Sequence, residues 1–303
     1  MTKKIGMLRL LLKDKFATCA AVILATLIVV ALFSPVVFGD LATDQNLSAT
    51  NLPPLSLDAG WQYILGSDPL GRSVLVRLMT ASQTTLAVVI PTVLIGLVIG
   101  SLWGVWAAYH RGWRETLSMR IVDIIMSFPS LLLAVVILFV LAPSVANIIL
   151  VLAVTRLPVY MRTARAEAAE VRSRTFVDAA RTLGAGSNAI LGRHIIPVVL
   201  PTLLTLATLE ISHVLLAESA LSFLGIGVQP PDVSWGLMVA QGRSYLQTAW
   251  WLSFFPGIAI VLTAISANLL AAWMRIALDP AQRWRLTVPQ KRIKATLRRI
   301  AWN

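Results

Sequence analysis

The sequence predicts an all-α membrane protein with about six transmembrane helices. Of its 303 residues, 57% are hydrophobic and 13% are charged, and the mean hydropathy is +0.77. These values lie outside the usual range for a soluble globular chain. A helix needs about 20 apolar residues to cross about 30 Å of hydrocarbon. Runs of roughly this length occupy residues 16–38, 84–109, 121–142, 146–161, 198–218 and 250–274. The fourth run is marginal in length, so the expected number is six, with an error of about one.

The first run resembles a secretory signal in one respect, because basic residues precede it. These residues are Lys3, Lys4, Arg9, Lys13 and Lys15. However, the apolar run from Phe16 to Phe38 is longer than a typical signal core, and no small-x-small cleavage pattern follows it. We therefore expect a retained helix, with cleavage as the alternative. Cys19 is the only cysteine, so the chain has no intrachain disulfide.

The charge distribution predicts the orientation of the chain. Most of the 26 Lys and Arg residues lie in four segments, 1–16, 110–120, 162–193 and 275–303. By contrast, the segment 39–66 contains Asp40, Asp44 and Asp58 and no Lys or Arg. Because Lys and Arg concentrate on the cytoplasmic side of membrane proteins, we expect both termini and the loops 110–120 and 162–196 in the cytoplasm. The formal charge of +12 is then explained without a nucleic-acid partner.

These observations divide the chain into five parts. The expected parts are a basic cytoplasmic N-terminus (1–15), a first transmembrane helix (16–38), a periplasmic loop (39–83), a transmembrane domain (84–280) and a basic cytoplasmic tail (281–303). Within the periplasmic loop, the aromatic residues Trp61 and Tyr63 indicate a short interfacial helix.

A polar segment, 174–197, interrupts the apolar runs on the predicted cytoplasmic side. It reads as two short amphipathic helices around a glycine turn, in which Gly184 stops the first helix in a left-handed conformation. Ser187 or Asn188 is expected to cap the second helix, and Pro197 to end it or to open the next one. Such a hairpin suits a groove on another protein. The apolar face of its first helix comprises Phe176, Val177, Ala180 and Leu183.

The same segment carries a family resemblance. Asp178-Ala179-Ala180, then Gly184 after three residues, then a His194-Ile195-Ile196-Pro197 run after nine more, resembles the EAA-x3-G-x9-I-x-L-P loop of permease subunits of binding-protein-dependent ABC importers. The resemblance implies a type I importer permease bundle in which this loop is a cytoplasmic coupling helix that docks on an ATP-hydrolysing subunit. The residues that it assigns to coupling are Asp178, Ala179, Ala180, Gly184 and Pro197.

Three further segments resemble the peptide and nickel branch of that family, in particular its second, C-type subunit. They are GSDPLGRS at 66–73, MRIVDIIMSFPS at 119–130, and the run from Ala217 to Gly236 that contains LSFLGIGVQPP. One departure is clear. Ala271, Ala272 and Trp273 stand where that subunit commonly has Gly-Asp-Gly, which implies a different exit of the sixth helix.

The resemblance also implies the partners and the cargo. The expected partners are a homologous second permease in a heterodimer, two ATP-binding subunits, an extracytoplasmic solute-binding protein and the lipid bilayer. Peptides are the expected cargo, with nickel, a metal chelate, an opine or an oligosaccharide as alternatives. The chain has no GxxxxGK[ST], HExxH, CxxC or GxSxG motif, so an enzyme is not predicted. ATP and Mg²⁺ would bind to the partner subunits, and no cofactor to this chain.

Ionisable residues inside apolar runs are the candidates for a solute pathway, since each costs about 3 kcal/mol at membrane depth. They are Asp123, Arg156, Glu210 and His213. Glu210 and His213 are three residues apart and share a helix face, where they either line a pathway or hold the bundle together. Asp123 and Arg156 are expected nearer the cytoplasmic ends of their helices. An ion-coupled secondary transporter, which would use such buried charges, is the alternative class. The three histidines are too scattered to indicate a metal site.

Small residues and prolines predict the packing of the spans. Gly96, Gly100 and Gly104 recur every four residues and permit close approach of a neighbour, either within this chain or at a subunit interface. Pro129 and Pro158 are expected to kink the third and fourth spans.

Overall fold

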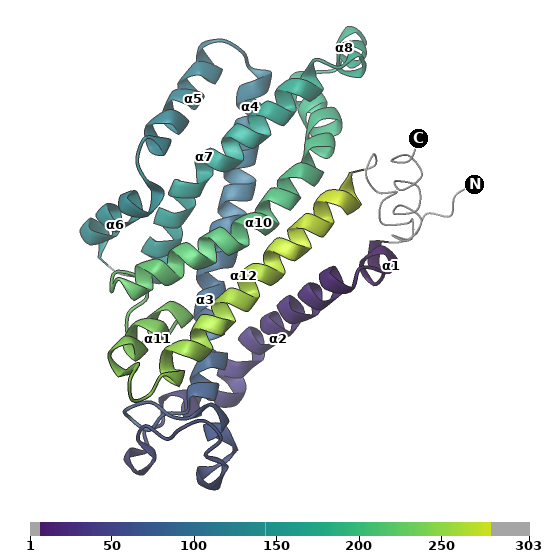
Figure 1. The fold of residues 1–303 in the computed structure, drawn as a ribbon. Helices are drawn as coiled ribbons and strands as arrows, with labels where there is room; N and C mark the ends of the chain where they lie inside the picture. The colour runs from purple at the N-terminus through teal and green to yellow at the C-terminus, as the bar shows by residue number, and fades with distance from the viewer. Residues whose placement is uncertain (1–6, 143, 280–303) are drawn as a thin grey trace, which may run out of the picture.

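A computed structural model describes residues 7–142 and 144–279, and these residues form a helical bundle (Figure 1). The helices are α1 (Met7–Leu11), α2 (Lys15–Thr43), α3 (Val74–Ile95), α4 (Ser101–Tyr109), α5 (Trp113–Met126), α6 (Ser130–Leu141), α7 (Val145–Arg172), α8 (Thr175–Thr182), α9 (Ser187–Ile190), α10 (Ile196–Phe223), α11 (Trp235–Gly242) and α12 (Trp251–Leu278). Two π turns, η4 (Gly96–Gly100) and η5 (Leu191–Ile195), join α3 to α4 and α9 to α10. Short 3₁₀ turns are η1 (Leu47–Ala49), η2 (Leu57–Ala59), η3 (Trp61–Leu65) and η6 (Arg243–Tyr245).

The predicted all-α membrane architecture is confirmed. Within the described residues, five helical segments are long and apolar enough to cross a membrane, and the pair α5 and α6 makes a sixth if it counts as one broken span. Two of the five segments are composite, because α3, η4 and α4 run together over Val74–Tyr109, and α9, η5 and α10 over Ser187–Phe223.

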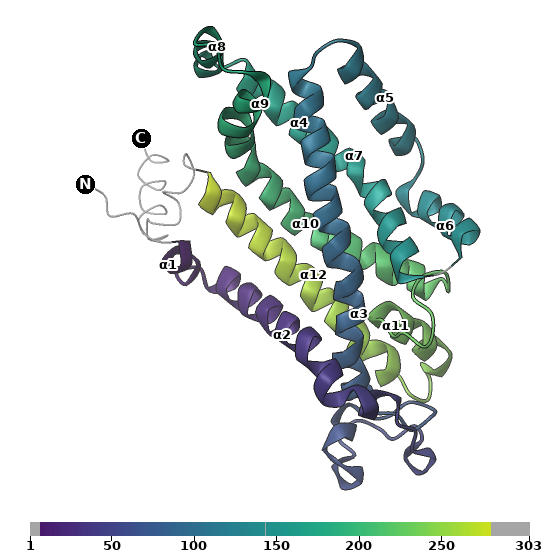
Figure 2. The same ribbon diagram turned by 180° about the vertical axis from the view of Figure 1, so that it is seen from behind.

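The long helices lie side by side in a bundle and are slanted in the views shown (Figures 1 and 2). α12 packs between α2 and α10, α10 packs on α7, and α4 packs on the face of α7 that is turned towards the viewer in Figure 2. The arm of α5 and α6 lies along the outer side of α7. We call the end of the bundle that carries α8 the hairpin end, and the end that carries residues 44–73 and α11 the loop end.

The third span departs most from a straight helix. α5 and α6 meet at an angle of 85° across residues 127–129. Pro129 stands directly before α6, where its ring disfavours a helical conformation of Phe128. The kink predicted at Pro129 is therefore a complete break. α7, in contrast, remains helical through Pro158, so no break divides the fourth span.

The predicted loop 39–83 was too long, because α2 continues to Thr43 and α3 already begins at Val74. The first turns of α3 are polar and lower the apolar signal of the sequence, yet their groups have partners. Ser73 accepts a hydrogen bond from the Val76 amide at 3.2 Å and caps the helix. Thr80 donates to the Val76 carbonyl at 3.1 Å. The short helix expected around Trp61 is present as η3.

The glycines of the second span face α7 of the same chain. A Cβ atom on Gly96 would lie 2.4 Å from the Tyr160 ring, and one on Gly104 would lie 2.4 Å from the Met161 carbonyl oxygen. This contact decides between the two alternatives for the glycine face in favour of packing within the chain.

The unusual Ala271 and Trp273 lie inside the bundle, on the last turns of α12. Both are buried, and Trp273 packs in a small apolar cluster with Leu10 of α1 and Ala17 of α2. The replaced glycines therefore leave α12 helical to Leu278 and attach its end to the first two helices.

Gly104→Ala should destabilise the chain by about 1–3 kcal/mol, since the Met161 backbone cannot yield as a flexible side chain would. Gly257→Ala is the matched control, because no atom lies within 4 Å of the added Cβ in another long apolar helix. Thermal unfolding in detergent compares the two variants. Equal unfolding midpoints would contradict the assigned α4–α7 contact.

Candidate functional site

The hairpin between α7 and α10 has the predicted glycine turn. Gly184 has φ +85°, and its amide donates to the Arg181 carbonyl at 3.0 Å. The prediction that Ser187 or Asn188 caps the second helix was wrong. Gly186 occupies the N-cap position of α9, and α9 begins at Ser187 without a side-chain cap. The extended backbone of Gly186 makes the turn into α9, so Ser187 and Asn188 fall inside the helix.

The apolar face predicted for α8 is divided between the two sides of the hairpin. Val177 is fully buried in a cluster with Ile190, Ile195 and residues of α4 and α7. Leu183 is 87% exposed and Phe176 is 41% exposed. α8 is thus fixed to the bundle by one side chain and presents apolar surface outward.

The polar residues of α8 are also exposed. The Arg181 guanidinium pairs with the Asp178 carboxylate at 3.1 Å within the same helix, and Ala179 beside them is exposed. The Asp178-Ala179-Ala180 segment therefore lies on the accessible side of the hairpin end.

The second half of the hairpin is not a separate short helix. α9, η5 and α10 form one helical unit, and Pro197 lies in the first turn of α10, as one of the two predicted alternatives proposed. Pro197 has no N–H for the carbonyl four residues earlier, and the π turn η5 directly precedes it. The helix that follows the Gly184 turn therefore runs as one segment to the opposite end of the bundle.

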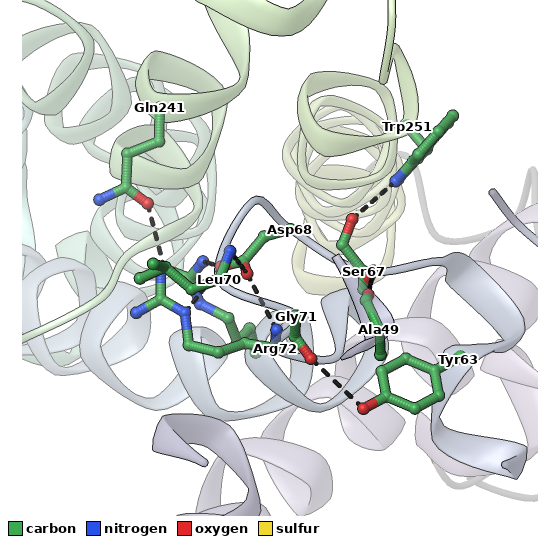
Figure 3. A network of polar contacts seen from close by, with 10 residues as sticks. Ala49, Tyr63, Ser67, Asp68, Leu70, Gly71, Arg72, Gln241 and Trp251 are labelled. Atoms are coloured by element: carbon green, nitrogen blue, oxygen red, sulfur yellow. Dashed lines mark hydrogen bonds and ion pairs between the residues drawn. The ribbon is translucent and has the colours of Figure 1, made fainter. Parts of the chain in front are cut away.

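A buried charge cluster stabilises the loop end (Figure 3). The Asp68 carboxylate accepts hydrogen bonds from the amides of Leu70 and Arg72 at 2.9 Å each. It also pairs with the guanidinium groups of Arg72 at 2.7 Å and Arg77 at 2.5 Å. Arg77 then donates to the Gln241 side chain of α11 at 3.1 Å. This cluster ties the GSDPLGRS segment to α3 and α11.

Neighbouring hydrogen bonds add to this charge cluster, and we call the whole set the loop-end clasp. The Trp251 indole donates to the Ser67 carbonyl at 3.1 Å, and the Ser67 hydroxyl donates to the Ala49 carbonyl. The Tyr63 hydroxyl donates to the Gly71 carbonyl at 3.3 Å. Gly71 has φ +72° and approaches the Asn46 backbone closely, so a side chain does not fit there.

Glu218 is a second buried carboxylate. It lies in the run from Ala217 to Gly236 that resembles the family, but the sequence alone assigned it no role. It is fully buried near the loop end of α10 and accepts a hydrogen bond from Ser222 at 2.7 Å. Ser222 in turn accepts from the Val228 amide at 3.0 Å. Ser234, which caps α11, lies 3.4 Å from Ser222. The spacing of Glu218 and Ser222, one helical turn, was the available signal.

The structure brings three of the four candidate pathway residues together. The Arg156 Nε and Glu210 Oε2 atoms are 3.9 Å apart, and His213 Nδ1 lies 3.4 Å from Glu210 Oε1. Glu210 is buried, whereas the His213 side chain is 57% exposed. Asp123 lies elsewhere, in a half-exposed pair with Arg162 at 2.5 Å.

The expected position of Arg156 was wrong. It lies 11 residues into the 28-residue α7, about 16 Å along the helix from Val145 and near the middle of the span. The sequence estimate failed because α7 continues to Arg172, well beyond its apolar part.

Two cavities adjoin Arg156. One of about 260 Å³ lies between α6, α7 and α10 and includes His213. The other, of about 210 Å³, lies between α5, α6 and α7 and includes Pro158. Across residues 7–142 and 144–279, no three His, Cys, Asp or Glu side chains are grouped so as to hold a metal ion.

Residues 96–284 match the family model described as the binding-protein-dependent transport system inner membrane component. The chain belongs to this family. A putative peptide transport system permease protein of Brucella abortus is 36% identical over 272 residues, which cover 90% of each chain. The di/tripeptide transport system permease protein DppC of Pseudomonas aeruginosa is 38% identical over 251 residues, 82% of this chain and 83% of that one. The glutathione transport system permease protein GsiD of Escherichia coli is 36% identical over 272 residues, 88% and 87% of the two chains.

This permease is therefore a multi-pass protein of the bacterial inner membrane, and its long apolar helices are membrane spans. The family match begins at the π turn η4, whereas the relatives extend the similarity over most of the chain.

Asp68→Ala should destabilise the permease by about 3–5 kcal/mol, because it leaves the buried Arg77 without its carboxylate. Glu170→Ala is the control. It removes an exposed ion pair with Arg174 and should change stability by less than about 0.5 kcal/mol. Unfolding midpoints in detergent test both, and an unchanged midpoint for Asp68→Ala would refute the clasp.

Proposed function

We propose that this permease forms half of the translocation pathway of an ABC importer for di- or oligopeptides. A homologous permease supplies the other half, two partner subunits bind and hydrolyse ATP with Mg²⁺, and an extracytoplasmic solute-binding protein delivers the solute. The names of the relatives support peptides as the cargo. Nickel, metal chelates, opines and oligosaccharides remain the alternative cargoes within the same role.

The orientation follows from the positions of basic residues. Arginines gather at the hairpin end, whereas the loop end holds few, and two of these share the Asp68 carboxylate. By the positive-inside rule, the hairpin end faces the cytoplasm. Because successive spans alternate in direction, the start of α2 and the end of α12 lie on the same side (Figure 1). The basic segments 1–6 and 280–303, outside the described residues, continue from these ends. The hairpin-end arginines are Arg111, Arg114, Arg120, Arg165, Arg172, Arg174, Arg181 and Arg193.

The observation that carries the proposal is the exposed apolar surface of α8. A helix that places Leu183 and Phe176 in water is costly unless another protein covers it. The EAA-like residues Asp178, Ala179 and Ala180 lie between Phe176 and Leu183 in the chain, and this resemblance supports the ATP-binding subunit as the partner that covers the surface.

Coupling then uses the continuity of the hairpin with α10. Closure of two ATP-binding subunits displaces α8, the Gly184 turn transmits the displacement to α9, and α10 carries it past Pro197 towards the middle of the membrane. The permease rocks against its homologue, and access alternates between the two faces.

The proposal is tested by ATP-dependent uptake into liposomes that contain the complete importer. Uptake of labelled dipeptides and tripeptides should require ATP and the solute-binding protein. Uptake of nickel or an oligosaccharide instead would replace the cargo but keep the role. Uptake by this permease alone, driven by an ion gradient, would establish the secondary transporter.

Gly184→Val should abolish most uptake and weaken capture of the ATP-binding subunit, because a β-branched residue is strained at φ +85°. Gly186→Val is the matched control. It adds the same volume two residues away at φ −69°, and neither position has an atom within 4 Å of the new Cβ. Co-purification and uptake are measured for both. Normal uptake by the Gly184 variant would reject the turn as a coupling element.

A further inference from the structure

Arg156 stands between two cavities that follow one another along the bundle. The larger cavity extends from Arg156 along α10 to Ala217 and Ala220, towards the loop end. The smaller cavity extends from Arg156 to Pro158 and Val159, towards the hairpin end. The residues common to both linings are Ser130, Thr155 and Arg156, and Arg156 is the charged residue among them.

The ion pair of Arg156 is poorly satisfied. The Nε and Oε2 atoms are 3.9 Å apart, beyond hydrogen-bond distance, and within the described part of the chain both lack a hydrogen-bond partner. At the loop-end clasp, by contrast, Arg77 lies 2.5 Å from its carboxylate. A guanidinium at mid-membrane depth is expensive and pairs closely where its role is structural. The Arg156–Glu210 pair is therefore longer than an ion pair whose role is to hold helices together.

The surroundings identify the ligand chemistry. Glu210 faces Arg156 on one side and His213 on the other, and the buried Tyr160 phenol lies within electrostatic range of both Arg156 and Glu210. The Arg156 side chain is 19% exposed, at the boundary of both cavities, whereas Glu210 is 4% exposed. Of the two partners in this ion pair, the guanidinium is thus the more accessible. A planar guanidinium binds a carboxylate through two parallel hydrogen bonds, and a peptide carries one carboxylate at its C-terminus.

We propose that Arg156 is a solute-contact residue that binds the carboxylate of the transported peptide as it passes from one cavity to the other. Glu210 holds Arg156 loosely in the absence of solute and keeps its charge balanced. The arriving carboxylate replaces this long contact with a direct one, and Glu210 then retains His213. The inference rests on the proposed importer function and adds the residue and the chemical group that meet inside the membrane.

The test compares Arg156→Gln, Glu210→Gln and the double variant Arg156→Gln/Glu210→Gln in the complete importer. Each single variant leaves one unbalanced charge and is expected to impair assembly, whereas the double variant is neutral and should assemble like the wild type. If the Arg156–Glu210 pair only holds the helices together, the double variant should also recover uptake. If Arg156 binds the solute, uptake by the assembled double variant should remain at least tenfold below that of the wild type.

A second measurement identifies the carboxylate. A dipeptide and its C-terminal amide are each supplied as the preloaded complex with the solute-binding protein. The wild type should move the free acid faster than the amide, and the double variant should move both at one reduced rate. Wild-type uptake by the double variant, or an unchanged preference for the free acid, would overturn the assignment of Arg156, as would a wild type without such preference. A wild-type importer that moves no peptide would instead overturn the peptide cargo of the proposed function.

Discussion

A charged side chain that is buried in the protein or in the membrane finds no water, so every buried charge of this permease needs a partner from the protein itself. The buried acids meet this requirement to different degrees. Asp68 is fully satisfied by two guanidinium groups and two backbone amides. Glu218 is enclosed by serine hydroxyls that also bind the loop after α10. Glu210 is satisfied least, with an ion pair at 3.9 Å and a histidine at 3.4 Å. The first two sites fix the loop end, whereas the third is held by longer contacts.

α7 is the element on which the polar and the apolar parts of the bundle converge. Its Tyr160 and Met161 receive the glycine face of the second span, so that α4 and the π turn η4 pack closely against it. One turn earlier, Arg156 faces α10 and the two cavities. A shift of α10 along α7 therefore changes the Arg156 environment while the glycine contact keeps α4 in place. α7 thus carries both the closely packed glycine contact and the long Arg156–Glu210 ion pair.

The sequence was sufficient for the features that depend on local chemistry. Apolar run length predicted the membrane spans, Gly184 predicted the left-handed turn, and Pro129 predicted the interruption of the third span. It was insufficient where a helix continues through polar residues. Arg77 and Thr80 masked the start of α3, and the polar last turns of α7 hid the central position of Arg156. In both cases hydrogen bonds and ion pairs satisfy the polar side chains of a continuing helix, and hydropathy within a window does not record such partners.

The hairpin is attached to the bundle by buried apolar side chains on both sides of its turn. Val177 and Ile190 anchor the hairpin to the cluster around α4 and α7, so α8 cannot move freely of the membrane helices. A force on its exposed side must pass either into this cluster or along α10. The π turn η5 and Pro197 lie where the second route begins, and there the regular hydrogen-bond ladder is already interrupted. Movement at this point costs less than bending an intact helix. This second route leads along α10 to Glu210, which is buried in the bundle.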